Sequence, residues 1–472
     1  MLPVARAIRY APSVRRATAI LVSSVLGLFG CGDEKAPTSG PAPTTEAPTA
    51  TVASAMASAS ASAPEPEKRK PMNVMLITID SLRADMPWTG YDKQIAPHLT
   101  KLANESTVYT RAYTISSFTS KTVGGLLSGR HPSTLYRGCT FFTEYSEANV
   151  FFPELLQEAG VHTMAGHAHL YFDRGKNLRQ GFDDWRLVDG LKWDAETDVS
   201  VTSQKMTPMA QEMLGQAKGK FFAWFHYMDP HDKYMSHDES PDFGHKARNL
   251  YDGEVFYTDL WVHRLLEWSK KQPWFDDTAI IISADHGEAF GEHDMWKHAF
   301  ALWEVLTHVP LIIKIPDGKP QRIEARRSQL DLVPTIFEML DVPIPEGQFV
   351  GKSMLPELMG EPADDREPIM VDLPPDTYNP PTRAVIKGDY KLIEDPGPKY
   401  KLYNLTKDPD EKLNLAGNPK HKQALQDMKK VFDEAWKPHP RRTPYGGKKL
   451  IGGGRANGPK GPEGWVEPAK SK

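Results

Sequence analysis

The feature that most constrains the fold of this chain is a series of short apolar runs that alternate with helical patterns. The first run, residues 73–80, reads NVMLITID and is almost continuously apolar, as is typical of a strand buried on both faces of a parallel sheet. Similar runs occupy residues 221–226, 278–283 and 309–315, and helical patterns occur at 97–105, 153–159, 253–270 and 330–340. The alternation predicts an α/β sandwich with a mostly parallel central sheet, here residues 72–367.

The pattern changes after residue 368. Short β-type segments (AVIKGDYKLIED, KYKLYNL) precede a helical pattern at residues 423–436. This order predicts a small antiparallel α+β subdomain over residues 368–436. Beyond it, residues 437–472 are rich in Gly, Pro, Lys and Arg, and we expect a flexible, mildly basic tail.

The N-terminus has the pattern of a secretory signal. Four arginines within residues 6–16 precede an apolar run at 17–29, which is too short for a membrane span and ends at Gly30-Cys31. The run LFGC resembles a bacterial lipobox, so we expect residues 1–30 to be removed and Cys31 to be acylated; an ordinary signal peptide with an accidental Cys is the alternative. Residues 31–71 are dominated by Ala, Pro, Ser and Thr and predict a disordered tether. The predicted location is the bacterial cell envelope, with the chain lipid-anchored and facing the periplasm or the exterior.

Net charge and cysteine content exclude some partners and cross-links. The net charge of −4 indicates no general attraction to nucleic acid or to anionic membranes, so a charged partner must be bound by a local site. The chain has two cysteines, and if Cys31 carries lipid, Cys139 has no partner for an internal disulfide. We expect Cys139 to be a buried apolar residue.

Polar side chains follow three of the predicted strands. Asp80 closes the first run, Asp285 and His286 follow the run at 278–283, and His231 follows the run at 221–226. Ligands collect beyond the carboxyl ends of strands in open α/β sheets. A single Asp there is more often a turn or cap residue, but two carboxylates and an imidazole together predict a divalent cation site with oxygen and nitrogen ligands.

A hydroxyl-rich segment, SSFTSK at residues 116–121, precedes the helix-compatible run TVGGLLSG. Its first interpretation is a helix N-cap. A helix N-terminus also attracts anions, and a hydroxyl there that binds a metal would be an activated nucleophile. Gly124 and Gly125 would allow another part of the chain to approach the helix closely.

Many motifs in this chain resemble the sulfatase family of the alkaline phosphatase superfamily, in the usual order. The opening segments are NVMLITIDSLRAD, APHLTKLANES and FTSKTVGGLLSGRHPS, and the central ones are AGHAHLYF, LRQGFDDW, FHYMDPHDKY, ISADHGEAFGEH and HVPLIIKIP. The closing segments are LDLVPTIFEML, GKSMLPEL, RAVIKGDYKLIEDP and KLYNLTKDPDEKLNLAG. The resemblance covers roughly residues 72 to 435. It implies the alkaline-phosphatase type of sandwich and hydrolysis of an anionic sulfate or phosphate ester.

The resemblance also implies roles for individual residues. The positions that match the family's metal ligands are Asp80, Asp285 and His286, whereas Ser81 stands where sulfatases usually have a second Asp. Three histidines match residues that contact the oxygens of the sulfuryl or phosphoryl group: His167, His169 and His231. His298, with Lys297 beside it, falls near the family's cationic residue that assists the leaving group.

The nucleophile position departs from the family. True sulfatases carry C-x-P-S-R or S-x-P-S-R, whose first residue is oxidised to formylglycine. Counting back from Gly129-Arg130 places Thr119 in that position and Val123 in place of the supporting Arg. Threonine cannot become formylglycine, so Thr119 itself is the predicted metal-bound nucleophile. A second register that starts at Ser117 is the alternative.

A single divalent metal is expected, because the D-x-x-x-H pair that completes a second site in related enzymes is broken at Asp229, where Lys233 replaces the His. The resemblance favours Ca²⁺, with Mn²⁺ or Zn²⁺ as alternatives. The leading hypothesis is a metal-dependent ester hydrolase. The alternatives are a transferase that moves a phospho-head-group to a cell-envelope acceptor, and a catalytically inactive scaffold. No nucleic-acid partner is expected, and the oligomeric state is left open.

Overall fold

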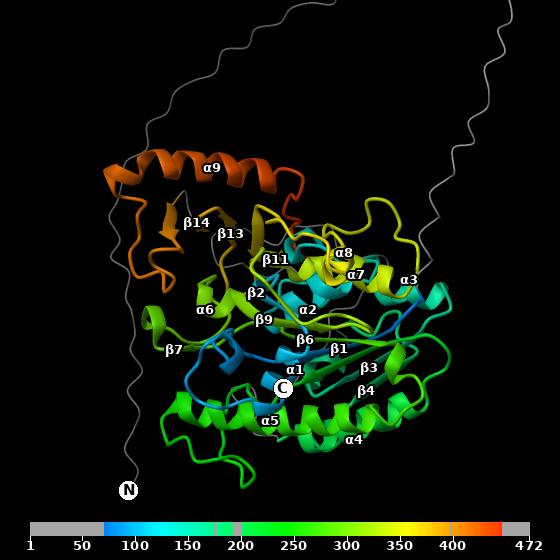
Figure 1. Ribbon diagram of the computed structural model, residues 1–472. Coiled ribbons are helices and arrows are strands. Elements are labelled where there is room, and N and C mark those ends of the chain that lie inside the picture. The colour runs from blue at the N-terminus through cyan, green and yellow to red at the C-terminus, as the bar shows by residue number, and fades with distance from the viewer. Residues whose placement is uncertain (1–69, 174–176, 192–200, 397–398, 446–472) are drawn as a thin grey trace, which may run out of the picture. The chain divides into compact units, whose positions relative to one another are not determined.

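The computed structural model describes residues 70–445 except 174–176, 192–200 and 397–398. The predicted signal peptide, Cys31 and nearly all of the predicted tether therefore lie outside the described residues. A central sheet and a smaller C-terminal sheet form the framework (Figure 1). Among the helices that the structure describes, none is both long and apolar enough to cross a membrane.

The central sheet is mostly parallel, as predicted. Its strand order over the described residues is β10-β2-β9-β6-β1-β5-β3-β4, and β11 also pairs with β2. The strand bounds are β1 Asn73–Ile79, β2 Thr107–Tyr113, β3 His162–His167, β4 Asp184–Leu187, β5 Phe221–Tyr227, β6 Thr278–Ala284, β9 His308–Lys314, β10 Gln321–Ile323 and β11 Arg327–Ser328. β1 lies between β5 and β6, parallel to both. The fold is therefore the predicted α/β sandwich.

Strand β9 is antiparallel to its neighbours β2 and β6. The apolar run at 309–315 predicts a strand buried on both faces, and it is buried, but such a run carries no information on direction. Parallel neighbours need a connection that crosses back over the sheet. Residues 285–307 instead hold the β7–β8 hairpin (Ala289–Phe290 and Trp296–Lys297), with a short 3-10 turn (Glu292–Asp294) at its tip, and the four-residue helix α6 (Glu304–Thr307). The chain therefore enters β9 from the edge at which it left β6.

Helices cover both faces of the central sheet (Figure 1). The helices of one face are α1 Pro97–Asn104, α4 Ser203–Gly215 and α5 Ala247–Ser269, and those of the other are α2 Thr119–Ser128, α3 Phe152–Glu158 and α7 Leu332–Met339. Successive residues of β1 alternate between the two apolar cores: Val74 and Leu76 pack with α2 and α7, and Met75 and Ile77 pack with α1 and α5. Each fully buried aliphatic side chain stabilises the fold by about 1.5–3 kcal/mol.

The C-terminal sheet is antiparallel, with order β12-β13-β14-β15, as predicted for this subdomain. Its strands are β12 Ile369–Leu373, β13 Thr382–Lys387, β14 Tyr390–Asp395 and β15 Lys399–Asn404, preceded by the short helix α8 Leu355–Leu358. Helix α9 (Lys422–Trp436) buries Met428, Phe432 and Trp436 against this sheet.

Residues 437–445, which the sequence assigns to the flexible tail, pack against the rest of the protein. Tyr445 is buried, and its backbone N–H donates to the carbonyl of Arg137 at 3.0 Å. The backbone N–H of Arg442 donates to the carbonyl of Ser133. The rest of the predicted tail, residues 446–472, lies outside the described residues.

Candidate active site

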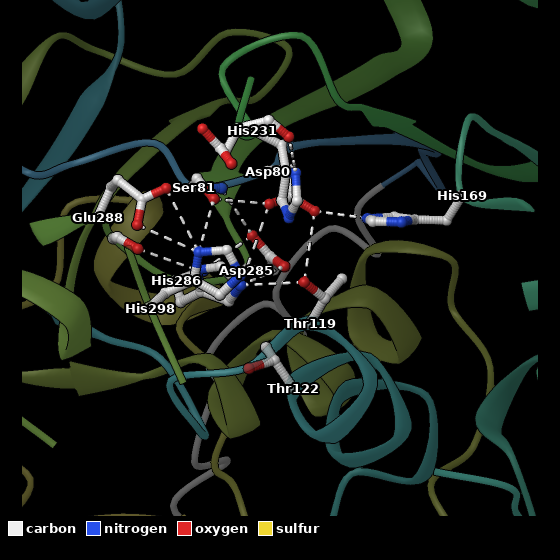
Figure 2. A network of polar contacts seen from close by, with 12 residues as sticks. Asp80, Ser81, Thr119, Thr122, His169, His231, Asp285, His286, Glu288 and His298 are labelled. Carbon is white, nitrogen blue, oxygen red and sulfur yellow. Dashed lines mark hydrogen bonds and ion pairs between the residues drawn. The ribbon is translucent and has the colours of Figure 1, made fainter. Parts of the chain in front are cut away.

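The carboxyl edge of the central sheet brings together side chains that are far apart in the sequence. Asp80 directly follows β1, and Asp285 and His286 directly follow β6. Thr119 is the first residue of α2, and His169 lies two residues beyond β3. Figure 2 shows these side chains converging around Asp80. They meet because β1, β3, β5 and β6 are parallel and end at the same edge.

Asp80 is the centre of the cluster and is fully buried. Its Oδ2 lies 2.5 Å from His169 Nε2 and 3.3 Å from His226 Nε2, and its Oδ1 accepts the Ser81 hydroxyl at 2.8 Å. Burial opposes ionisation of this carboxyl. The charge of His231 and the hydrogen bonds from His169 and His226 outweigh that effect and hold the pKa of Asp80 well below its usual value. Asp80 is therefore held as a carboxylate.

Asp285 and His286 face Asp80. Burial, followed by the negative charge of Asp80, raises the pKa of Asp285 to about 7. Its Oδ2 is buried, has no hydrogen-bond partner within the part of the chain that the structure describes, and lies 3.2 Å from His286 Nε2, which is 4.0 Å from Asp80 Oδ1. Two buried carboxylates that repel one another, with an orphaned oxygen and an imidazole nitrogen between them, fit a divalent cation. The donors that would hold it are Asp80, Asp285 and His286.

The Thr119 hydroxyl points into this cluster. Its Oγ1 lies 3.0 Å from His286 Nε2 and 3.4 Å from Asp80 Oδ2, and the residue is buried. Thr119 is the first residue of α2, where backbone N–H groups have no partner inside the helix and the helix dipole favours negative charge. An oxyanion on Oγ1 would therefore be stabilised at this position.

Ser117, the alternative nucleophile, points elsewhere. Its hydroxyl donates to the carbonyl of Ala299 at 2.9 Å. The helix N-cap is Phe118, which has no capping side-chain hydrogen bond, so the hydroxyls of this segment do not serve as the N-cap that the first interpretation suggested. Val123, at the position of the family's Arg, lies in the apolar core. The structure thus places Thr119, and not Ser117, next to the carboxylates.

Glu288 and His298 form a second buried group beside Ser81. His298 Nδ1 lies 3.2 Å from Glu288 Oε1 and 3.5 Å from the Ser81 hydroxyl, and its ring stacks on that of His286 with centroids 4.2 Å apart. Tyr234 donates its hydroxyl to Glu288 at 2.9 Å. Burial raises the pKa of Glu288 to about 7 and lowers that of His298 to about 3. This group lines the cluster on the side where the family has its second Asp.

His231 and Lys297 lie nearer the surface. The His231 ring is edge-on to His298 at 5.0 Å and to His169 at 6.1 Å, so it sits above the cluster (Figure 2). The side chain of Lys297 is half exposed and pairs with Asp232 at 2.6 Å. His298, rather than Lys297, is the member of this predicted pair that contacts the cluster.

Two other residues from the sequence argument lie outside the cluster. His167 is buried between Phe172 and Trp185, 3.3 Å from Asp173, and no contact with Asp80 or Thr119 is seen in the described part of the chain. Asp229 accepts hydrogen bonds from the backbone N–H and hydroxyl of Thr202, both at 2.6 Å, and from the Ser203 N–H at 2.8 Å. Asp229 thus caps the start of α4, and both of its carboxylate oxygens are used in these hydrogen bonds.

His226 and Glu288 are site residues that the sequence motifs do not indicate. His226 lies inside the apolar run FFAWFHY, where a lone imidazole at a strand end was a signal that could have been used. Glu288 directly follows the Asp285-His286-Gly287 motif. Both depend on contacts between segments that are distant in sequence, so the motif order alone does not reveal them.

The mixed α/β sheet, with carboxylates, imidazoles and a hydroxyl gathered at its carboxyl edge, agrees with membership of the alkaline phosphatase superfamily. Within this class, the family model described as "Sulfatase" matches residues 72–342, and a second, "N-sulphoglucosamine sulphohydrolase, C-terminal", matches residues 291–437. The chain therefore belongs to the sulfatase family.

Three similar proteins show the range of relatives. A choline-sulfatase from Rhizobium meliloti is 21% identical over 432 residues, which cover 74% of this chain and 83% of that protein. The phosphonate monoester hydrolase of Agrobacterium radiobacter superposes with a TM-score of 0.67 at 16% identity, over 79% of this chain and 96% of that chain. A third protein, solved in complex with its substrate D-glucosamine-2-N,6-O-disulfate, superposes with a TM-score of 0.66 at 18% identity. The match covers 78% of this chain and 98% of that chain. The two structures share the fold of this chain.

Proposed function

We propose that this chain is a metal-dependent hydrolase of sulfate or phosphate esters in which Thr119 is the nucleophile. The observation that carries the proposal is the position of Thr119 Oγ1, 3.0 Å from His286 and 3.4 Å from Asp80 at the start of α2. A divalent cation held by Asp80, Asp285 and His286 would supply positive charge to the ester oxygens and make the Thr119 hydroxyl more acidic.

The first step is attack by Thr119 Oγ1 on sulfur or phosphorus. A bond forms from Oγ1 as its hydroxyl proton is lost to solvent, the bond to the ester oxygen breaks, and the leaving alcohol takes up one proton from solvent, so the step consumes no net proton. The positive end of the α2 dipole would stabilise charge on the transferred group, and the rings of His169 and His231 lie 6.1 Å apart at the same edge of the sheet. Water then releases the group from Thr119.

The chemistry of threonine favours phosphorus within this substrate range. Formylglycine releases sulfate by elimination from the sulfated form of its hydrated aldehyde, a route that Thr119 lacks because its Cβ carries only one oxygen. A Thr119 ester must instead be cleaved by water at the transferred atom, as in covalent phosphoryl intermediates. The phosphonate monoester hydrolase neighbour supports this preference, whereas the choline-sulfatase relative and the glucosamine disulfate complex support a sulfate ester.

The donor set also bears on the metal. Ca²⁺ prefers six to eight oxygen ligands, whereas imidazole suits Zn²⁺ and other transition metals. His286 contributes nitrogen, and Ser81 supplies no carboxylate where the family has one. We therefore propose Mn²⁺ or Zn²⁺ ahead of Ca²⁺, with one ion, since Asp229 is committed to α4.

The test compares Thr119→Val and Thr119→Ser on an aryl phosphodiester and an aryl sulfate. Thr119→Val keeps the shape of the side chain but removes the hydroxyl, and should lower kcat by more than about a thousandfold. Thr119→Ser should retain turnover. Mass spectrometry of the quenched peptide should find the transferred group on Thr119. A Thr119→Val variant that turns over like the wild type would refute the proposal.

Group transfer to an acceptor alcohol is the alternative outcome, and it differs only in the second step. Adding a small alcohol to the assay separates the two: a hydrolase partitions mainly to the free acid, and a transferase to the alkyl ester.

We also propose, from the sequence of residues 1–71, that Cys31 carries lipid and holds the enzyme at the surface of the cell envelope. Cys31→Ser should move the full-length chain from the membrane fraction to the soluble fraction, with activity per molecule unchanged on a soluble substrate. Persistence of Cys31→Ser in the membrane fraction would contradict the anchor.

A further inference from the structure

A row of buried hydrogen-bonded side chains leads from the core of the sheet to Asp80. The Trp224 indole N–H donates to Thr78 Oγ1 at 2.8 Å. Thr78 Oγ1 lies 2.7 Å from His226 Nδ1, and His226 Nε2 lies 3.3 Å from Asp80 Oδ2. Each of the four residues is at most 2% exposed, so solvent does not compete for these hydrogen bonds.

The row follows from strand register. β1 and β5 pair in parallel, with Leu76 opposite Trp224 and Thr78 opposite His226. Because side chains two residues apart share a face of a strand, Thr78 and Asp80 point the same way, as do Trp224 and His226. This is the face that α2 covers, so the row ends where Thr119 enters the cluster.

One arrangement of the protons gives every donor in this row an acceptor. An indole N–H can only donate, so Thr78 Oγ1 accepts from Trp224. The hydroxyl proton of Thr78 then has one remaining partner among its described contacts, His226 Nδ1. With Nδ1 as the acceptor, the proton of the ring is on Nε2 and is directed at Asp80 Oδ2.

The geometry argues against a second cation between Asp80, His169 and His226, although their donor atoms lie close together. Tetrahedral zinc bound at the usual distances separates its ligand atoms by roughly 3.3 Å. Asp80 Oδ2 and His169 Nε2 are 2.5 Å apart, which is a direct hydrogen bond. His169 therefore acts on the carboxylate and leaves no room for an ion between the two atoms, and the number of bound ions tests the same point for His226.

We propose that Trp224, Thr78 and His226 form a positioning relay, which holds the Asp80 carboxylate in the orientation needed to bind the divalent cation. The inference rests on the metal-dependent function proposed above. Hydrogen-bonding partners of ligating side chains fix the orientation of the ligand, and their loss typically costs 10- to 100-fold in metal affinity. Thr78 is the sharpest place to test the relay, because it touches neither the metal donors nor the substrate space.

The experiment compares Thr78→Val with Thr78→Ser in the full-length protein. Thr78→Val keeps the β-branched shape and removes the hydroxyl, whereas Thr78→Ser keeps the hydroxyl. Calorimetric titration of metal-free protein with Mn²⁺ or Zn²⁺ gives affinity and stoichiometry, and thermal unfolding of the same samples reports stability. We expect one ion per chain, a 10- to 100-fold weaker Kd in Thr78→Val, and a near wild-type Kd in Thr78→Ser.

A second readout does not depend on metal. Nitrogen NMR of the imidazoles should place the proton of His226 on Nε2 in the metal-free wild type and in Thr78→Ser, and should show a changed tautomer in Thr78→Val. Equal Kd values for the two variants would overturn the relay while leaving the proposed function intact. Two ions per chain, falling to one in His226→Ala, would overturn it by making His226 a ligand. A wild-type protein that binds neither ion would overturn both proposals.

Discussion

At the scale of single residues, Ser81 links the two carboxylates of the site. Its φ of 59° is in the left-handed region, which non-glycine residues rarely adopt and which is common at functional sites. That conformation directs its N–H to Asp285 Oδ1 at 3.1 Å, while its hydroxyl donates to Asp80. Ser81 therefore orients both carboxylates without adding a third.

Ser81→Asp should restore the family's additional carboxylate. Asp tolerates the left-handed conformation, so we expect tighter binding of a divalent cation, by about tenfold or 1.4 kcal/mol. The same change should lower the melting temperature of the metal-free protein, because three carboxylates would then repel one another. Calorimetric titration and thermal unfolding measure the two effects, with Ser81→Ala as the control. Unchanged affinity in Ser81→Asp would contradict this account of the site.

His131 gives a pH prediction at a position away from the cluster. It is buried against Trp436, with ring centroids 4.8 Å apart, and neither ring nitrogen has a hydrogen-bond partner among the described residues. Burial lowers the pKa of His131 to about 3, from an ordinary value of 6.5. Between these pH values the imidazole is protonated in the unfolded chain but not in the folded chain. Protonation of the unfolded chain therefore lowers the free energy of unfolding as the pH falls below 6.5, and it has little effect above that pH.

His131→Phe should therefore make unfolding less dependent on pH. The wild type should lose roughly 2 kcal/mol through His131 between pH 7 and pH 5, and the variant should not lose that part. Urea unfolding at the two pH values measures the difference. The same loss of stability in both proteins would show that the buried ring is not responsible.

At the scale of elements, α2 is held in place by the close approach of Tyr145 to Gly124. A Cβ on Gly124 would lie 2.1 Å from Tyr145 Cζ. The Tyr145 hydroxyl donates to the carbonyl of Ser120 at 2.8 Å, in the first turn of the helix that carries Thr119. The close backbone approach that the Gly124-Gly125 pair predicts is thus made by an aromatic ring that also supports the nucleophile's turn.

Gly124→Ala should displace Tyr145 and disturb that turn. We expect a loss of about 1–3 kcal/mol in the free energy of unfolding, together with reduced turnover. Gly215→Ala is the matched control, since Gly215 ends α4 and a Cβ there would meet nothing within 4 Å. Denaturant unfolding of both variants gives the comparison, and equal stability would contradict the packing argument.

Elements and site residues differ in how far the sequence predicts them. The buried runs and helical patterns give the sandwich, because burial on two faces requires continuous apolar residues. They do not give the direction of β9, which depends on the path of residues 285–307. For the site, the motifs bring Asp80, Asp285 and His286 together, but strand register decides that His226 reaches Asp80 and that His167 does not. Register depends on pairing between distant segments, and no local pattern encodes it.

At the scale of the whole molecule, a buried ion cluster joins the C-terminal sheet to the rest of the described chain. Lys391, on β14, is fully buried and pairs with Glu304 at 2.9 Å and with Glu411 at 3.0 Å. Glu304 is the first residue of α6, in the segment that leads from the site residues to β9. The subdomain therefore abuts the loop that carries His298.

Lys391→Met should leave the buried carboxylate of Glu411 and the partly buried carboxylate of Glu304 without their cation. Breaking a buried pair in this way typically costs 3–5 kcal/mol, so we expect a loss of about that size in the free energy of unfolding. Lys430→Met is the control, because Lys430 is exposed on α9 and its pair with Glu434 spans 3.9 Å. Urea unfolding should separate the two variants clearly. Similar stabilities would mean that the cluster does not hold the subdomain in place.

The two-residue spacing of Thr78 and Asp80, matched by Trp224 and His226, has a consequence for how sequences of this type can change in length. Inserting or deleting one residue within β1 or β5 would turn every later side chain of that strand to the opposite face. Asp80 would then point toward α1 and α5, away from Thr119. Tolerated length changes inside these two strands must therefore come in even numbers, whereas the loops outside them are free of this parity rule. Sequence alignments and grafts that place an odd number of inserted or deleted residues inside β1 or β5 should therefore be rejected.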